Sequence, residues 1–228
     1  MQIVDPFISS PCGYAPPSEP AWVRPGMAAL GLLEPRFAQV ETCAGPLPWR
    51  TRAFGFPGML RAICGQQISN AAAGAIWGRL SALPGASTPA GLLALDDAAL
   101  CGGAGLSRPK AAHARSLAQA CLDGRLDFAA LPALPDAAAA ARIAAIRGLG
   151  PWTAGIYLLF AEGRPDVFPH GDVALAAGAA HLLGLPARPT PQALSAMALA
   201  WSPWRSLAAR LLWHHWRWVT GRGAGDGE

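Results

Sequence analysis

The stretch IRGLGPWTAGIYLLFAEGRPDVFPHGD, residues 146–172, decides how this chain is interpreted. It holds a Gly-Leu-Gly turn, an apolar helix, a Pro-rich loop and an aspartate at its end. Because glycine tolerates positive φ and has no Cβ, Gly148 and Gly150 allow a tight turn between two helices. Backbone N–H groups of such a turn, with those of the helix that begins at Pro151, form an anion site. We expect Leu149 to pack inward, although a G-x-G motif is also typical of a plain helix–helix turn.

Asp172, at the end of this stretch, has two interpretations. It follows Phe-Pro-His-Gly at the start of the next helix, where an aspartate commonly serves as the N-cap. Glu162 and Asp166 are the only other acids between Ala137 and Gly225. A carboxylate held at the mouth of a cleft would stabilise positive charge on a reacting sugar and orient a water for attack. Taken in isolation, the capping role is the simpler explanation.

The composition is that of a folded, mildly basic protein. The chain has 228 residues, of which 52% are hydrophobic and 14% charged, with a net charge of +4 and a pI near 9.1. These values suit one large domain or two small subdomains with a sizeable core. Residues 42–95 and 173–225 contain arginines but no acid, so they would form a positive face suited to phosphates. A soluble basic surface without a partner is the alternative.

Several classes of protein are excluded by the cysteines, histidines and apolar runs. None of the five cysteines has C-x-x-C spacing, which argues against a zinc ribbon, an iron–sulfur cluster and a disulfide framework. The histidines lack the spacing of metal ligands. The N-terminal residues 1–14 do not resemble a signal peptide, and no uninterrupted apolar run is long enough to span a membrane. We therefore expect a cytoplasmic protein, associated with the nucleoid if it binds DNA.

The order of helix signals predicts an all-α fold. Residues 1–24 are rich in proline and are expected to form an extended arm, residues 25–220 a helical domain, and residues 221–228 a flexible tail. No stretch shows the period-2 alternation of a β-strand. About ten helices are expected, at residues 26–43, from 57 through 63, 69–80, 96–103, 107–124, 136–147, 151–160, 172–184, 190–201 and 203–220.

Tryptophans are concentrated beside the turn and near the C-terminus. Trp152 follows the turn directly, and five more lie between residues 201 and 218. Most are expected in the core, because tryptophan is large and apolar. One or two would instead line a pocket and stack on a flipped base, where a cationic damaged base gains cation–π attraction.

Four separated motifs together resemble a known family. IRGLGPWTA at residues 146–154, followed by FPHGD at 168–172, resembles the helix-hairpin-helix, Gly/Pro-rich loop and aspartate (HhH-GPD) signature of base-excision DNA glycosylases. LRAICGQQIS at 60–69, GLSRPKA at 105–111 and WSPWRS at 201–206 are similar to the 3-methyladenine DNA glycosylase II, or AlkA-type, branch. The resemblance implies a two-subdomain helical fold with a cleft between the subdomains.

The resemblance also implies roles for individual residues. Asp172 matches the catalytic aspartate, and Trp152, Trp213 and Ile156 match positions that line the base pocket. The hairpin from Gly148 through Leu149, Gly150, Trp152 and Thr153 matches the segment that binds the DNA backbone, with a monovalent cation such as Na⁺ or K⁺ at its carbonyl groups. Gln67 matches the wedge inserted where the nucleotide leaves the duplex. Further DNA contacts are expected from Gln66, Ser69, Arg108, Lys110 and Arg205.

Two departures from the family bear on the expected activity and on the expected domain organisation. Bifunctional relatives carry a lysine just after the hairpin, where this chain has Trp152, and Lys110 is its only lysine. Schiff-base chemistry needs an amine, so β-lyase activity is not expected. Since about 25 residues precede the first expected helix, we also expect no N-terminal β-domain of the AlkA type.

The resemblance therefore predicts a monofunctional, monomeric DNA glycosylase that acts on duplex DNA. It would hydrolyse the N-glycosidic bond of alkylated bases such as 3-methyladenine and 7-methylguanine, with no cofactor beyond the hairpin cation. A glycosylase for etheno, hypoxanthine or uracil lesions is one alternative. The other is a non-catalytic helix-hairpin-helix DNA-binding module, which would need neither Asp172 nor the pocket tryptophans.

Overall fold

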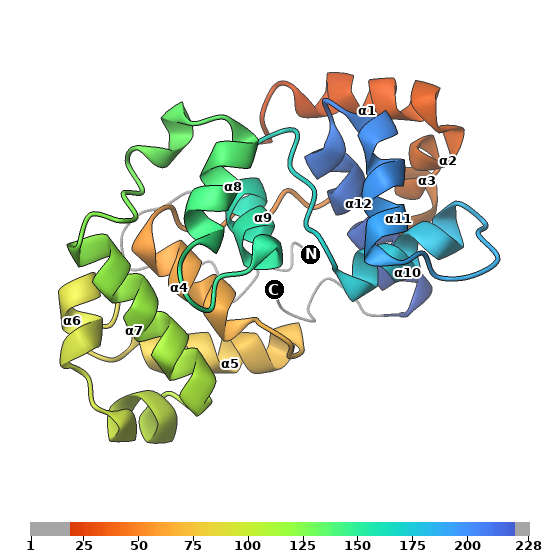
Figure 1. Ribbon diagram of the computed structural model, residues 1–228. Coiled ribbons are helices and arrows are strands. Elements are labelled where there is room, and N and C mark those ends of the chain that lie inside the picture. Colours follow the sequence, from red (N-terminus) through yellow and green to blue (C-terminus); the bar gives the residue numbers. More distant parts are fainter. Residues whose placement is uncertain (1–18, 222–228) are drawn as a thin grey trace.

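The structure, a computed structural model, describes residues 19–221, and helices without any strand make up this part of the chain (Figure 1). This confirms the predicted all-α class. Most of the expected N-terminal arm, and all but Gly221 of the expected tail, lie outside the described residues. The elements are α1 (Val23–Leu33), α2 (Pro35–Ala38), α3 (Val40–Ala44), α4 (Phe56–Cys64), α5 (Asn70–Ser81), α6 (Pro89–Ala94), the π-helix η1 (Ala98–Gly103), α7 (Arg108–Leu122), the 3₁₀-helix η2 (Leu131–Ala133), α8 (Asp136–Ala144), α9 (Pro151–Phe160), α10 (Val173–Leu182), α11 (Pro191–Ala198), the 3₁₀-helix η3 (Leu199–Trp201) and α12 (Arg205–Val219).

The expected helices that start at residues 69, 107 and 190 each begin with an N-cap at that residue. The hydroxyl oxygens of Ser69, Ser107 and Thr190 each accept a hydrogen bond from the backbone N–H three residues further on. Such a bond satisfies one of the donors that the first turn of a helix leaves without a partner. The helices α5, α7 and α11 therefore begin where their local sequence specifies.

One expected helix, at residues 26–43, is wrong as a single element. The chain forms α1, α2 and α3 there, with Glu34 in an extended conformation (φ −142°, ψ 101°) between the first two. Proline disfavours the α conformation in the residue before it, so Pro35 ends α1 at Leu33. The carboxylate of Glu34 then accepts from the N–H of Arg36 and caps α2.

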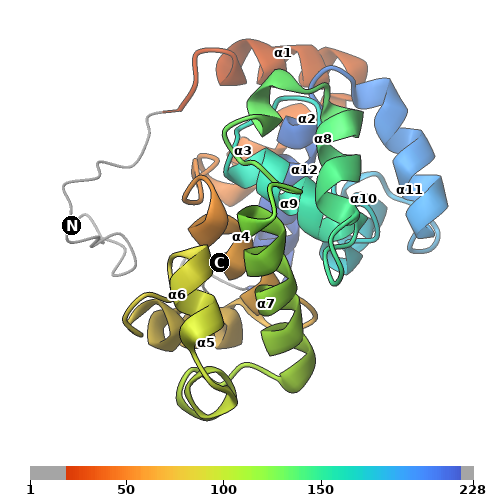
Figure 2. The ribbon, with the colours of Figure 1, turned by 60° about the vertical axis from the view of Figure 1, so that its left-hand side comes forward.

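Two hydrophobic cores divide the molecule into two subdomains. The first core is built by α4 to α9, and the second by α1 to α3 with α10 to α12. Figure 1 shows these groups on opposite sides of the molecule, and Figure 2 shows α9 packed among the other helices. The helix α9 is buried from Thr153 to Phe160 and contributes Tyr157 to the first core and Ile156 to the second. A helix that is apolar on all sides is a buried one, which is the position of α9.

The chain passes from the second subdomain to the first through residues 45–55, which are bound to α9. The N–H of Gly55 donates to the hydroxyl of Tyr157 at 2.9 Å, and the N–H of Arg52 donates to the carbonyl of Phe160 at 2.9 Å.

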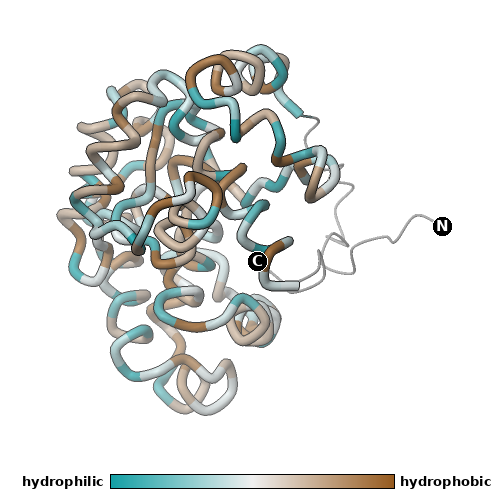
Figure 3. The backbone as a smooth tube through the Cα atoms, turned by 90° about the vertical axis from the view of Figure 1, so that its right-hand side faces the viewer, coloured by the Kyte–Doolittle hydropathy of each residue, from teal (hydrophilic) through white to brown (hydrophobic). Residues whose placement is uncertain are grey.

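Hydrophobic and hydrophilic residues are interspersed along the tube in Figure 3. None of the helices between residues 19 and 221 has the length and apolar character that crossing a membrane requires.

Candidate active site

The hairpin between α8 and α9 is a tight, well-packed turn. The N–H of Ile146 donates to the carbonyl of Ile143, and the N–H of Leu149 donates to the carbonyl of Ile146, both at 3.0 Å. The side chain of Leu149 is 2% exposed and belongs to the first core. The buried side chain of Leu149 therefore holds the turn rigid, while the backbone of the turn lies at the surface.

The two glycines of the hairpin meet different demands. Gly148 has a φ of +88°, and a methyl group there would collide with the ring of His113 in α7. Both facts require glycine. Gly150 has an ordinary φ of −84°, is exposed, and has no atom within 4 Å of where its Cβ would lie. Nothing inside the protein requires glycine there, so the missing side chain leaves room for a group that approaches from outside.

The first turn of α9 has the features of an anion site, although anion binding stays a prediction. The helix has Gly150 as its N-cap, without a side-chain cap bond, and its first turn contains no acid. The N–H groups at such a helix start attract an anion because of the helix dipole. Arg147, which is exposed in the turn, adds positive charge.

Asp172 is the N-cap of α10 and also accepts hydrogen bonds from two tryptophans. Its Oδ1 accepts from the N–H of Leu175 at 2.8 Å and from the indole Nε1 of Trp213 at 3.1 Å. Its Oδ2 accepts from the indole Nε1 of Trp152 at 2.9 Å. Three N–H donors from α9, α10 and α12 thus hold a half-buried carboxylate in one orientation. The capping role is confirmed and uses only Oδ1, while a chemical role for the same side chain stays a prediction.

The loop that carries Asp172 is anchored on both subdomains. Arg164 bonds the carbonyls of Leu131 and Leu134 and pairs with Asp136 and Glu162 at 2.7 Å each. Three residues later the other side of the loop is held by α12, where Ser206 donates to the carbonyl of Val167 and accepts from its N–H. These anchors hold the aspartate in place relative to α9.

Asp166 and Arg205 form a second anchor of this loop. The guanidinium binds both carboxylate oxygens, at 2.8 and 2.9 Å, and Ser202 donates to one of them. Although burial opposes ionisation, the bonds from Arg205 and Ser202 lower the pKa of Asp166. The expected phosphate contact of Arg205 stays a prediction, and its guanidinium already binds a carboxylate.

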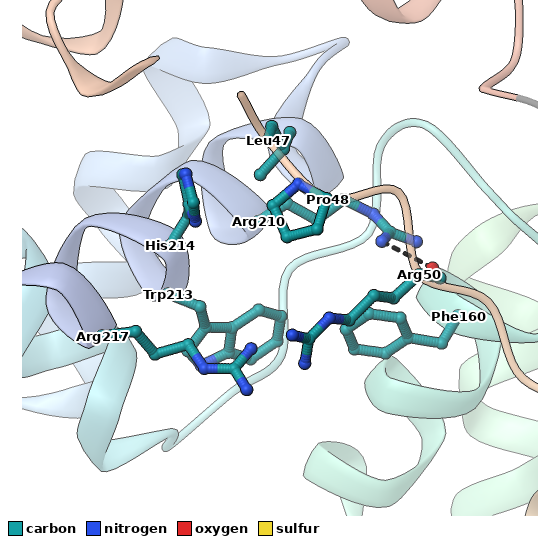
Figure 4. Close-up of a pocket in the computed structure, with 8 residues that line it drawn as sticks. All are labelled: Leu47, Pro48, Arg50, Phe160, Arg210, Trp213, His214 and Arg217. Carbon is teal, nitrogen blue, oxygen red and sulfur yellow. Dashed lines mark hydrogen bonds between the residues drawn. The ribbon is translucent and has the colours of Figure 1, made fainter. Parts of the chain in front are cut away.

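A small pocket adjoins Trp213 on the α9 and α12 side (Figure 4). It has about 280 Å³ of empty space, including its open mouth. Trp213 and Phe160 stack in it, with ring centroids 5.7 Å apart and planes at 25°. The guanidinium of Arg210 lies over Phe160 and Trp49, at 4.5 and 4.1 Å from the ring centroids. The lining consists of Leu47, Pro48, Arg50, Phe160, Arg210, Trp213, His214 and Arg217.

The other expected pocket residues lie along α9. Trp152 is half-buried, and Ile156, one turn later, is 3% exposed in the second core. Residues four apart lie on one face of a helix, so Trp152, Ile156 and Phe160 form a continuous apolar strip toward α12. The structure therefore brings Trp152, Trp213 and Asp172 together, with Ile156 buried below them.

The expected DNA-contacting residues divide into buried and exposed ones. Gln67 and Ser69 are exposed in the α4–α5 turn, and Arg108 is exposed at the start of α7. By contrast Gln66 is turned inward, with its side-chain Nε2 donating to the hairpin. A wedge or DNA contact by Gln66 would break these bonds, so the geometry does not support that role.

Lys110 also lies inside the protein. It is 9% exposed and its Nζ donates to the carbonyl of Cys64 at 2.7 Å, at the end of α4. Burial lowers the pKa of Lys110. The amine binds a helix C-terminus, where a cation is favoured, so a phosphate contact by Lys110 is not supported.

Hairpin carbonyl groups have the chemistry that a monovalent cation needs. They are uncharged oxygen donors, and a helix end leaves several carbonyls without helical partners. The carbonyls of Ile143 and Ile146 accept the turn bonds described above, and the carbonyl of Gly148 accepts from Gln66 at 2.9 Å. Each carbonyl has a second lone pair, so the donor set fits the expected cation.

Two features of the site have no signal in the sequence. The aromatic residues were expected to face a base, but the direction of the indole N–H groups toward Asp172 depends on how α9 and α12 pack. The contact of His113 with Gly148 likewise arises from the packing of α7 on the hairpin. Of the remaining histidines, His215 bonds His181, His170 bonds Ser195, and His214 bonds the carbonyl of Gly45. Among the described residues they form no group of three that could hold a metal ion.

Comparisons with known proteins identify relatives of this chain. The family model described as HhH-GPD superfamily base excision DNA repair protein matches residues 60–205. A DNA-3-methyladenine glycosidase from Bacillus halodurans has a similar structure, with a TM-score of 0.72, 31% identity, and coverage of 89% of this chain and 93% of that one. Schizosaccharomyces pombe 3-methyladenine DNA glycosylase Mag1, in complex with abasic DNA, gives a TM-score of 0.77 at 25% identity, with coverage of 90% and 100%.

Curated relatives match over shorter segments. YfjP of Bacillus subtilis is 32% identical over 107 residues, which are 47% of this chain and 37% of that protein. DNA-3-methyladenine glycosylase 1 of S. pombe is 28% identical over 159 residues, covering 68% of this chain and 69% of that one. The match to Mycobacterium tuberculosis AlkA covers only 14% of that longer protein.

Proposed function

The chain belongs to the HhH-GPD superfamily of base excision DNA repair proteins, and from that premise we propose that it is a monofunctional glycosylase for alkylated bases in duplex DNA. The substrate would be a lesion such as 3-methyladenine or 7-methylguanine, and the reaction would be hydrolysis of the N-glycosidic bond. The observation that carries the proposal is the carboxylate of Asp172, held by Trp152 and Trp213 at the start of α10. A protein that only grips DNA needs no such group.

DNA would be held through its backbone. The uncapped start of α9 would bind one phosphate, with Gly150 leaving room for its approach. A monovalent cation at the hairpin carbonyls would add positive charge near that phosphate. The exposed Gln67 would occupy the gap that the extruded nucleotide leaves in the duplex.

Asp172 would act on the sugar rather than on the base. As the bond to a cationic base breaks, positive charge develops on the sugar, and a fixed carboxylate stabilises it. Both oxygens already accept N–H bonds, so the carboxylate is oriented before the substrate arrives. It would direct a water to C1′ by accepting a hydrogen bond through a remaining lone pair.

We expect no strand cleavage because of the position of the lysine. Lys110 is the only lysine of the chain, and its amine binds the carbonyl of Cys64 in the interior of the first subdomain. A Schiff base requires a free amine next to the reacting sugar. Trp152 stands where bifunctional relatives carry that amine, and its indole N–H binds the aspartate instead.

A second substrate class is favoured by the pocket in Figure 4. Its lining includes three arginines and no acid. Neutral lesions such as hypoxanthine and etheno-adenine carry no charge that this positive lining would repel. A cationic base would meet like charge if it entered this pocket.

The test is base release from a panel of oligonucleotide duplexes, each with one defined lesion. Release of 3-methyladenine and 7-methylguanine ahead of the neutral lesions would support the proposal. Faster release of hypoxanthine or etheno-adenine would favour the second class. Binding to every duplex without release of any base would leave only the DNA-binding module.

A further inference from the structure

Gln66 joins the turn after α4 to the hairpin through a single amide group. Its Nε2 donates to the carbonyl of Gly148 at 2.9 Å and lies 3.0 Å from the hydroxyl of Thr153. Gly148 lies in the turn of the hairpin, and Thr153 lies in the first turn of α9. One side chain therefore binds both halves of the expected phosphate site.

His113 of α7 supports this arrangement from behind. Its Nδ1 lies 3.4 Å from the Oε1 of Gln66, and its ring fills the space where a side chain at Gly148 would be. The Oε1 atom can only accept, so the proton of the imidazole belongs on Nδ1 in this contact. His113 thereby holds the amide in the orientation that directs Nε2 at the hairpin.

The next residue, Gln67, has a strained backbone. With φ at 57°, it is the only non-glycine residue with positive φ among residues 19–221, and its side chain is exposed. A glutamine adopts this conformation only where the surrounding structure enforces it. Here the chain is held on both sides of Gln67, by Lys110 bound to the carbonyl of Cys64 and by Ser69 capping α5.

We propose that Gln66 is a positioning residue that couples the phosphate-binding hairpin to the exposed wedge at Gln67. This inference rests on the proposed function, because it concerns the residues that keep the duplex open after a nucleotide is extruded. The hairpin fixes the protein on the DNA backbone, and the amide of Gln66 sets where the tip of the wedge stands relative to that phosphate. His113 acts through Gln66 in the same role.

The first experiment compares two DNA substrates in single-turnover assays of Gln66→Met. Methionine has a similar length but donates no hydrogen bond. We expect release of 3-methyladenine from duplex DNA to fall about ten- to a hundredfold, as for other misplacements of about an ångström. Release from single-stranded DNA should change little, because no duplex has to be held open. The matched control is Gln119→Met, the same change at an exposed glutamine of α7 that bonds Asp123.

A second measurement does not depend on catalysis. Wild-type enzyme is bound to a duplex with an abasic-site analogue opposite 2-aminopurine, whose fluorescence rises when it unstacks. We expect Gln66→Met and Gln67→Ala to bind this duplex but to give a much smaller rise. If the wild type releases no base, the proposed function fails, while the fluorescence still decides the coupling.

Three results for Gln66→Met would overturn the coupling. The first is an equal loss of base release on duplex and single-stranded DNA, and the second is an unchanged rate of release on duplex DNA. The third is a fluorescence rise as large as that of the wild type. His113→Phe keeps a ring beside Gly148 but cannot bond Gln66, so it serves if Gln66→Met does not fold. It should show the same selective loss on duplex DNA.

Discussion

Replacing Asp172 by asparagine removes one negative charge and almost no volume. Asparagine is as good an N-cap as aspartate, so the bond from the N–H of Leu175 is retained. Since Leu175 and Trp213 both bind Oδ1, the indole of Trp152, which binds Oδ2, would then face an amide NH₂ instead of an oxygen. A lost bond of this kind costs about 1–3 kcal/mol of stability, which for a domain of this size lowers the Tm by roughly 2–12 °C.

The effect on base release should be far larger. A carboxylate about 4 Å from a developing cation, at an effective dielectric constant of about 20, contributes about 4 kcal/mol. Since each 1.36 kcal/mol is tenfold in rate, Asp172→Asn should slow release about a thousandfold. DNA binding should be unchanged or tighter, because a negative charge near the phosphates has been removed.

Single-turnover base release, with the enzyme in excess over duplex DNA containing 3-methyladenine, measures this effect. Binding is followed by the fluorescence anisotropy of a duplex with an abasic-site analogue. The matched control is Asp166→Asn, the same change in the same loop, which breaks the ion pair with Arg205. It should lower the Tm and slow release only severalfold, because Arg164 and Ser206 still anchor the loop. Near-normal release by Asp172→Asn, or an equal loss in both variants, would refute the argument.

Three further predictions concern the hairpin, the lysine and a histidine pair. Gly150→Ala should keep the wild-type Tm and weaken DNA binding about five- to tenfold, equivalent to the loss of about one hydrogen bond, as anisotropy would show; unchanged binding would contradict the phosphate site. Lys110→Met should still release bases, more slowly from duplex DNA because the bond to the carbonyl of Cys64 helps to hold Gln67, and borohydride should trap no covalent complex with DNA for either wild type or variant. His215→Phe should flatten the pH dependence of the Tm. Burial, and to a lesser extent the nearby His181 and His214, lower the pKa of His215 below 6.5 in the folded protein. The folded state therefore loses stability relative to the unfolded state as the pH falls below 6.5. A variant as acid-sensitive as the wild type would contradict this.

Local signals predict most of the fold because they are properties of short segments. Ser69, Ser107 and Thr190 cap helices through bonds to residues three positions away, so the sequence alone indicates where those helices begin. The prediction of a single helix at residues 26–43 is wrong because a second local signal, a proline, overrides the apolar spacing. That spacing continues through Pro35, but the backbone of Glu34 cannot stay helical before a proline.

The site is less predictable because its side chains respond to distant packing. Gln66 and Gln67 are adjacent and chemically identical, yet one is turned into the protein and the other outward. The difference arises from the left-handed backbone at Gln67 and from α7, whose His113 lies 47 positions from Gln66. No spacing rule within the turn itself would distinguish the two glutamines.

The carboxylate of Asp172 makes both a local hydrogen bond and hydrogen bonds that depend on distant packing. The bond from Leu175 is a helix cap, which any aspartate at that position would make. The bonds from Trp152 and Trp213 form only when α9 and α12 come together at the start of α10, as they do when the second core is assembled. With both oxygens engaged, the carboxylate is better suited to stabilising a cation than to removing a proton. On the proposed function, the departing base would then leave without much help from the enzyme, which would favour bases whose glycosidic bond is already weakened by alkylation and would protect undamaged DNA.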